Sequence, residues 1–143
     1  KILVDATQVT RPKAIDVKTL PYPGLPTDIQ PVLGVFLTRA DGTSVVTETV
    51  FGNRFMYIDE LKRMGAQMMR DGHSVIIVGV DHLDGTLLSC TDLRGGAAMV
   101  IGALCAQGDS EIQKIDHVLR GYEGLDQKLQ NLGAKIRYVE NGK

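Results

Sequence analysis

The sequence predicts an α/β fold, of mixed α+β character, in which a β-α-β-α-β-β unit occurs twice. An internal repeat is the first observation: a Thr-Asp pair at residues 91–92 follows one at residues 27–28 at a spacing of 64 (91 − 27), and Gly133 follows Gly65 at 68 (133 − 65). Second, β-branched runs alternate with segments that are apolar at helical spacing. Loop insertions between equivalent elements explain why the offset between the two copies grows along the sequence. We expect the two units to pack on a shared core.

In the first copy, the residues after Asp28 predict a helix that stops at the turn-forming residues 40–42. The apolar stripe expected to face the core consists of Ile29, Val32, Leu33, Phe36 and Leu37. The remaining elements are a strand at residues 43–50, a helix at 57–64 that ends at Gly65, and strands at 66–69 and 74–80 joined by a turn at 71–72.

The second copy follows the same order. Its expected elements are a helix at residues 97–105 that leads to Gly108, a strand at 111–115 and a helix at 125–132. Beyond these, residues 141–143 predict an irregular tail.

Composition excludes several classes of function. The net charge is −1 and Trp is absent, which argues against nucleic-acid binding. No apolar run approaches the roughly 20 residues that cross a bilayer, so no membrane segment is expected. Cys90 and Cys105 adjoin apolar segments and predict buried free thiols in a cytoplasmic protein. The three histidines show no metal-ligand spacing, and Gly-rich phosphate loops are lacking, so we expect no metal and no cofactor.

Charged residues at matching places in the two copies form the candidate site. Asp28 and Asp92 each precede a helix, where an Asp side chain can cap backbone N–H groups. Arg94 falls in the first helical turn, which is unfavourable for a cation unless an anion or a carboxylate is close. Arg54 and Arg120 are expected in equivalent loops. The arginines and helix N-termini predict a phosphate or carboxylate site; ordinary capping and local ion pairs remain alternatives.

Several long motifs, in this order, resemble the enolpyruvyl transferases that act on UDP-N-acetylglucosamine. These motifs are Pro-Tyr-Pro-Gly-Leu-Pro-Thr-Asp-Ile-Gln at residues 21–30, Thr-Glu-Thr-Val-Phe-Gly-Asn-Arg-Phe-Met at 47–56, Thr-Asp-Leu-Arg at 91–94 and Arg-Gly-Tyr-Glu at 120–123. The resemblance covers essentially the whole chain. It implies a partial lobe of an inside-out α/β barrel at residues 1–143, with the end of a preceding unit at 1–20, one repeat unit at 21–84 and another at 85–143.

The resemblance also implies roles for particular residues. Asp28 corresponds to the carboxylate that contacts the sugar 3-hydroxyl and is proposed to remove its proton. Arg94 and Arg120 correspond to arginines that bind phosphoenolpyruvate, and Arg54 to a further active-site arginine. Val50 corresponds to a residue that touches the UDP-sugar.

The resemblance also implies that Asp92 and Leu93 line the active-site cleft. The sequence departs from the family pattern at Gly52, where many relatives have Glu, and at Gly95, where Ala is more usual.

By the same resemblance, the other lobe supplies the proton-donor loop, a Lys-Asn pair for phosphoenolpyruvate and much of the nucleotide site. The chain lacks an initiator Met and starts in strand-like residues, so we expect a fragment. Because the resemblance places half of the site in the missing lobe, we expect no turnover. Apolar surface left exposed by the missing unit is expected to drive self-association. The expected activity is enolpyruvyl transfer in peptidoglycan synthesis. A shikimate-pathway transferase and a non-catalytic binding or scaffold domain are the alternatives.

Overall fold

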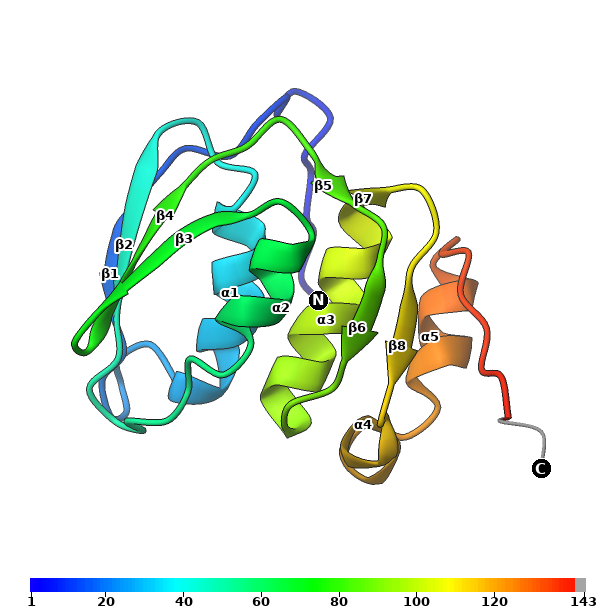
Figure 1. The fold of residues 1–143 in the computed structure, drawn as a ribbon. Helices are drawn as coiled ribbons and strands as arrows, with labels where there is room; N and C mark the ends of the chain where they lie inside the picture. Colours follow the sequence, from blue (N-terminus) through cyan, green and yellow to red (C-terminus); the bar gives the residue numbers. More distant parts are fainter. Residues whose placement is uncertain (141–143) are drawn as a thin grey trace.

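A four-stranded sheet combines one strand of the segment at residues 1–20 with three strands of the first repeat unit. In the computed structural model, which describes residues 1–140, β1 (Asp16–Lys18) runs parallel to β2 (Thr43–Thr47). β2 is antiparallel to β4 (Ser74–Val78), which forms a hairpin with β3 (Gln67–Asp71), so the strand order is β1-β2-β4-β3. Figure 1 shows this sheet on the left, with the helices beside it.

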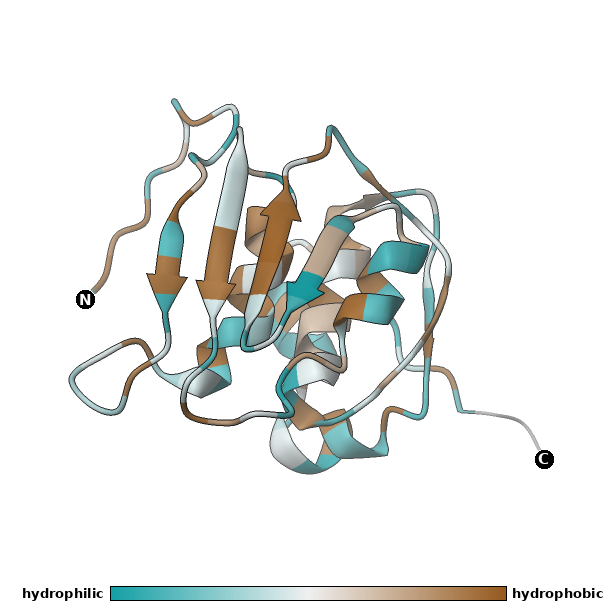
Figure 2. Ribbon diagram, turned by 60° about the vertical axis from the view of Figure 1, so that its left-hand side comes forward, coloured by the Kyte–Doolittle hydropathy of each residue, from teal (hydrophilic) through white to brown (hydrophobic). Residues whose placement is uncertain are grey.

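Helices cover one face of the sheet. A 3-10 turn, η1 (Thr27–Ile29), leads into α1 (Gln30–Leu37), and α2 (Ile58–Arg63) follows β2. Side chains from alternate strand positions, among them Val46 and Ile77, point toward these helices and are fully buried. Figure 2 shows the sheet in front and the helices behind it, as expected where one sheet face packs on the core and the other faces solvent.

The second copy continues the same core with shorter strands. Its elements are β5 (Leu83–Asp84), β6 (Leu87–Ser89), α3 (Leu93–Cys105), β7 (Ala106–Gln107), β8 (Glu111–Gln113), α4 (Asp116–Gly121) and α5 (Leu125–Asn131). β5 pairs with β7 and β6 with β8, both in parallel. α3 packs along α1, and Gly102 of α3 brings it close to Leu61 and Met64 at α2.

Backbone hydrogen bonds confirm the repeat. The bond from Thr19 N to Thr47 O has a counterpart from Cys90 N to Gln113 O, at offsets of 71 (90 − 19) and 66 (113 − 47). Ala14 N to Asp41 O and Gly85 N to Gln107 O keep the same two offsets.

The Thr-Asp pairs, in contrast, are 64 apart. Relative to the equivalent elements β6 and α3, seven additional residues (71 − 64), residues 20–26, therefore lie between β1 and η1.

The expected elements are confirmed in part. The second copy lacks the closing pair of strands of the unit, since residues 132–140 contain no strand, and the strand-like residues 1–4 are irregular. Three further differences concern the helices. α1 buries the side carrying Gly34 and Val35, while Ile29 and Phe36 of the predicted stripe are 50% and 56% exposed. α1 can do this because it is apolar nearly all round, so periodicity alone does not select one face.

The second difference is at α3, which begins at Leu93 rather than at residue 97, since Asp92 caps it. Third, the loop expected around Arg120 is the short helix α4, which Ile115, Val118 and Leu119 indicate by their spacing.

Two further expectations from the sequence concern membrane-spanning segments and the C-terminal tail. Within residues 1–140, no helix combines the length and the apolar character needed to cross a bilayer. The tail expected at residues 141–143 lies outside the described residues.

Candidate functional site

Three segments meet at the N-terminal ends of α1 and α3, which lie at the lower end of the molecule in Figure 1. η1 contributes Asp28, the turn after β2 contributes Arg54, and the first turn of α3 contributes Arg94. Asp28 Oδ1 accepts a hydrogen bond from Arg54 Nη2 at 3.1 Å, and Asp28 Oδ2 accepts one from Arg94 Nη2 at 2.7 Å. A single carboxylate, 49% exposed, thus joins arginines from both copies of the repeat.

Arg54 is held from three sides. Its side chain is only 12% exposed, and its guanidinium carbon lies 4.5 Å from the centre of the Phe51 ring, a cation–π distance. Arg54 Nε donates to Thr27 Oγ1 at 3.2 Å, while Nη2 donates to Asp28. The guanidinium is therefore fixed in orientation, with the neighbouring Asp28 carboxylate open to solvent.

Arg94 is also fixed, by Tyr122 as well as by Asp28. Arg94 Nη1 donates to Tyr122 Oη at 2.8 Å, and its guanidinium carbon lies 5.7 Å from the ring centre. The hydrogen bond to Tyr122 raises the pKa of Arg94; partial burial opposes this, and Asp28 adds to the increase. A cation at this helix end is favourable only where an anion or a carboxylate is close, and Asp28 provides a carboxylate.

The two aspartates differ, contrary to the expectation that both cap helices. Asp92 does cap α3, since its Oδ1 accepts from Arg94 N and Gly95 N, each at 2.9 Å. Asp28 makes no capping hydrogen bond. In the first copy the chain enters α1 through η1 and places Pro31, which has no N–H, at the helix start, while both Asp28 oxygens are taken by arginines.

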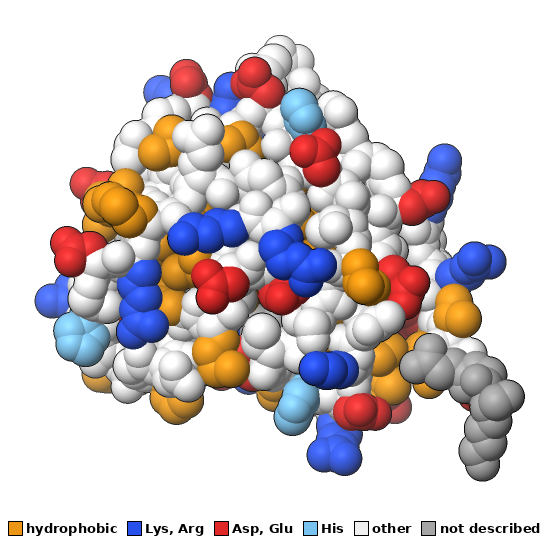
Figure 3. Space-filling view, viewed as in Figure 1, with side chains coloured by type: hydrophobic (Ala, Val, Ile, Leu, Met, Phe, Trp, Pro, Cys, Tyr) orange, Lys and Arg blue, Asp and Glu red, His pale blue; other side chains and the backbone are white. Residues whose placement is uncertain are grey.

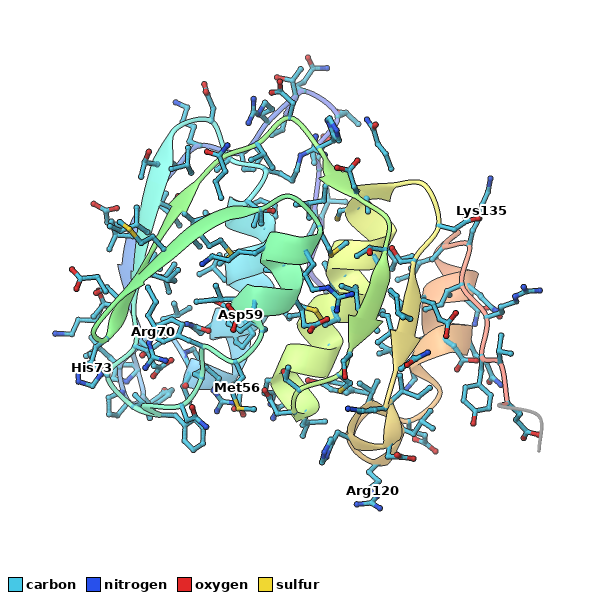
Figure 4. All side chains as sticks on the ribbon, viewed as in Figure 1. Met56, Asp59, Arg70, His73, Arg120 and Lys135 are labelled. Atoms are coloured by element: carbon cyan, nitrogen blue, oxygen red, sulfur yellow. The ribbon has the colours of Figure 1, made fainter. Side chains whose placement is uncertain are left out.

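The remaining predicted site residues lie around this centre or away from it. Val50 is half-exposed in the loop that leads to Arg54, and its backbone N–H bonds to Glu48. Leu93 packs so closely on Gly121 that a Cβ there would lie 2.3 Å from its Cδ1. Arg120 is exposed on α4, and its side chain points outward at the lower edge of the molecule (Figure 4). The functional roles of these three residues stay predictions.

Glu48 is a further candidate, outside the site residues predicted from the sequence. It is 1% exposed and accepts hydrogen bonds from the loops that carry Asp28 and Arg54. A signal was present, because residues 44, 46 and 48 alternate on the inward face of the strand region, which places a carboxylate in the core.

The cysteines behave differently from one another. Both thiols are free; Cys90 is buried as expected, whereas Cys105 is exposed at the end of α3. Burial raises the pKa of the Cys90 thiol, and the charge of Asp92 adds to this, so Cys90 is a poor nucleophile.

The described part of the chain holds no cluster of three or more His, Cys, Asp or Glu side chains suited to a metal ion. On the face in Figure 3, basic and acidic side chains are interspersed.

Comparisons with known proteins identify relatives of this chain. The chain is 55% identical over 128 residues to the UDP-N-acetylglucosamine 1-carboxyvinyltransferase of Halothermothrix orenii, covering 90% of this chain and 31% of the relative. It is 56% identical over 124 residues to an enzyme of the same name from Caldanaerobacter subterraneus subsp. tengcongensis, covering 87% and 30%. The chain thus spans about a third of these curated relatives.

Solved structures show the same fold. The enolpyruvyl transferase NikO from Streptomyces tendae superposes with a TM-score of 0.81 at 31% identity, over 90% of this chain and 30% of that one. EPSP synthase from Acinetobacter baumannii, at 17% identity and a TM-score of 0.53, supports the fold alone. The family described as EPSP synthase (3-phosphoshikimate 1-carboxyvinyltransferase) matches residues 1–141. With that match over nearly its whole length, the chain belongs to the EPSP synthase family of enolpyruvyl transferases.

Proposed function

We propose that this chain supplies part of the active site of a transferase that moves the enolpyruvyl group of phosphoenolpyruvate to the 3-hydroxyl of UDP-N-acetylglucosamine. The observation that carries the proposal is the Asp28 carboxylate held between Arg54 and Arg94. The reaction needs a base for a hydroxyl and cations for an anionic substrate, and this arrangement offers both within one cluster.

The chemistry divides between these groups. The sugar oxygen bonds to C2 of phosphoenolpyruvate, its proton passes to Asp28, and the methylene carbon gains a proton from a donor outside this cluster. The tetrahedral intermediate then loses phosphate from C2 and a proton from the new methyl group, which restores the double bond and gives the enolpyruvyl ether. Arg54 and Arg94 hold the carboxylate and phosphate charges in place, and Arg120 is proposed to join them when substrate is bound. Val50, Asp92 and Leu93 are proposed to border the sugar and the phosphoenolpyruvate.

The acceptor is proposed from the relatives' names. Curated relatives at about half identity carry the name UDP-N-acetylglucosamine 1-carboxyvinyltransferase, whereas the solved EPSP synthases are 17% identical. Shikimate 3-phosphate is therefore the weaker candidate acceptor. In the proposed role the protein acts in the cytoplasm, in peptidoglycan synthesis, and so contributes to cell-wall formation, cell shape and cell division.

We also propose that the chain by itself self-associates. Ile29 and Phe36 are seven residues apart and so share one side of the α1 region, where both are half-exposed. Sedimentation velocity over a concentration series should show a rising average mass. A constant monomer mass at all concentrations would contradict this proposal.

The activity is best tested in a chimaera in which this chain replaces the matching segment of the Halothermothrix orenii relative. With phosphoenolpyruvate and UDP-N-acetylglucosamine, the chimaera should release phosphate, and shikimate 3-phosphate should not replace the sugar nucleotide. The unmodified relative is the control for assay and folding. A chimaera that melts like the control but releases no phosphate would contradict the proposal, and preference for shikimate 3-phosphate would favour the second acceptor.

A further inference from the structure

A buried carboxylate lies beneath the Asp28–Arg54–Arg94 cluster. Glu48 is 1% exposed, directly after β2, and both of its oxygens accept hydrogen bonds. Oε1 accepts from Thr19 Oγ1 at 2.7 Å and from the backbone N–H groups of Val50 and Phe51 at 2.8 and 3.0 Å. Oε1 therefore fixes the loop that leads to Arg54 onto the end of β1.

The second oxygen faces the site. Glu48 Oε2 accepts from Thr27 Oγ1 at 2.9 Å, and the same Thr27 oxygen accepts from Arg54 Nε at 3.2 Å. A threonine hydroxyl has a single proton, so its donation to Glu48 leaves its lone pairs for Arg54. The result is a continuous chain of hydrogen bonds, from Arg54 through Thr27 to Glu48, beside the bond from Arg54 to Asp28.

The charge on Glu48 sets the donor-to-acceptor direction of these hydrogen bonds. Burial by itself raises the pKa of Glu48, but hydrogen bonds from Phe51 N–H, the Thr19 hydroxyl, Val50 N–H and the Thr27 hydroxyl outweigh it, and the pKa lies below its ordinary value. The ionised carboxylate only accepts hydrogen bonds, so the Thr27 hydroxyl must donate to it and receive from Arg54.

We propose that Glu48 is a positioning residue that orients Arg54, through Thr27, for the contact with Asp28 and with an anionic substrate. The functional part of this inference rests on the proposed transferase activity, whereas the positioning itself does not. Substrate is not expected to touch Glu48, because the side chain is closed off from solvent.

Glu48→Gln is the matched substitution. Glutamine is nearly the same size as glutamate. Its carbonyl oxygen takes the position of Oε1, where three donors converge. The amide NH2 of the glutamine then faces Thr27 and donates to its hydroxyl oxygen, which reverses the direction of that hydrogen bond. Thr27 Oγ1 thereby becomes a weaker acceptor for Arg54 Nε–H. Thr27→Val removes the hydroxyl altogether, Thr27→Ser retains it, and Thr19→Val removes a different hydroxyl from the same carboxylate.

The direct measurement is solvent exchange of the Arg54 Nε–H proton by NMR, in this chain. Exchange should become roughly tenfold faster in Glu48→Gln and Thr27→Val, and should return to the original rate in Thr27→Ser. Thr19→Val should lower the unfolding midpoint and leave the Arg54 signal unchanged. If Glu48→Gln and Thr27→Val lower the unfolding midpoint without altering Arg54 exchange, Glu48 is purely structural and the inference fails.

The chimaera tests the functional part. Thr27→Val should raise KM for phosphoenolpyruvate roughly tenfold, and Thr27→Ser should restore it. A fall in kcat with KM unchanged would contradict positioning of an anion-binding arginine. If the unsubstituted chimaera has no activity, the proposed function fails, while the NMR result still decides whether Glu48 positions Arg54.

Discussion

At the scale of single residues, Asp28 and Asp92 occupy matching places in the repeat and do different work. Asp92 satisfies two backbone N–H groups at the start of α3. Asp28 instead contacts arginines that are 26 and 66 residues away in the sequence. The carboxylate in the second copy thus stabilises a helix, and the one in the first copy is left for contacts between elements.

This difference predicts unequal effects on stability. Asp92→Ala should lower the free energy of unfolding by about 1 kcal/mol, because the α3 cap is lost. Asp28→Ala should have a smaller effect, since its partners form ion pairs at a half-exposed carboxylate, and such pairs contribute little. Urea unfolding of both variants measures the contrast. An equal loss, or a larger loss for Asp28→Ala, would mean that Asp28 is chiefly structural.

The ionisation of Glu48 should make the stability of the fold sensitive to acid. Its pKa is lower in the folded chain than the ordinary value of 4.5, so the ionised form stabilises the fold at neutral pH. That contribution is complete above the ordinary value and is lost as the pH falls through the lowered pKa. Urea midpoints measured from about pH 7 to about pH 3 should therefore fall less steeply in Glu48→Gln than in the unsubstituted chain. Parallel curves would contradict an ionised, hydrogen-bonded Glu48.

At the scale of elements, α1 is placed by close contact with a buried tyrosine. A Cβ at Gly34 would lie 2.5 Å from Tyr57 Oη and 3.1 Å from Tyr57 Cζ, and Tyr57 is fully buried. The glycine therefore lets α1 approach the start of α2, close to the loop that carries Arg54. This packing helps to set the distance between the Asp28 and Arg54 segments.

Gly34→Ala tests that packing. We expect a loss of about 1–2 kcal/mol in the free energy of unfolding, because overpacking of a rigid ring outweighs the better helix propensity of Ala. Gly52→Ala is the control, since a Cβ there meets nothing within 4 Å and should change stability by less than about 0.5 kcal/mol. Adding Tyr57→Phe should recover part of the loss, which a double-mutant cycle measures. Equal stability of the two alanine variants would contradict the close contact.

At the scale of the whole molecule, the candidate site lies where the two copies of the repeat meet. The parallel strand pairs β1–β2 and β6–β8 are equivalent, and the helices that follow β1 and β6, α1 and α3, pack on one another with their N-terminal ends together. One copy supplies Asp28 and Arg54, and the other supplies Arg94. Neither unit alone contains the cluster.

Much of this organisation could be predicted from the sequence, because repeats and helix ends are local patterns. The Thr-Asp pairs marked the approach to both helices, although the apolar pattern placed the start of α3 four residues too late (97 − 93). The position of Arg94 indicated a nearby anion or carboxylate. The identity of that carboxylate could not be predicted, because Asp92 is adjacent in sequence and Asp28 is close only in the fold. Burial of Ile29 and Phe36 was wrongly expected, since an all-round apolar helix leaves its orientation to tertiary packing.

The most direct test of the central claim, that Asp28 is a catalytic carboxylate rather than a structural one, is Asp28→Asn in the chimaera. Asparagine keeps the size of the side chain but cannot take a proton from a hydroxyl. We predict that kcat for enolpyruvyl transfer falls by roughly 10²–10⁴-fold, as for loss of a general base, while the melting temperature stays close to that of the unsubstituted chimaera. A clearly lower melting temperature with nearly unchanged kcat would contradict the account.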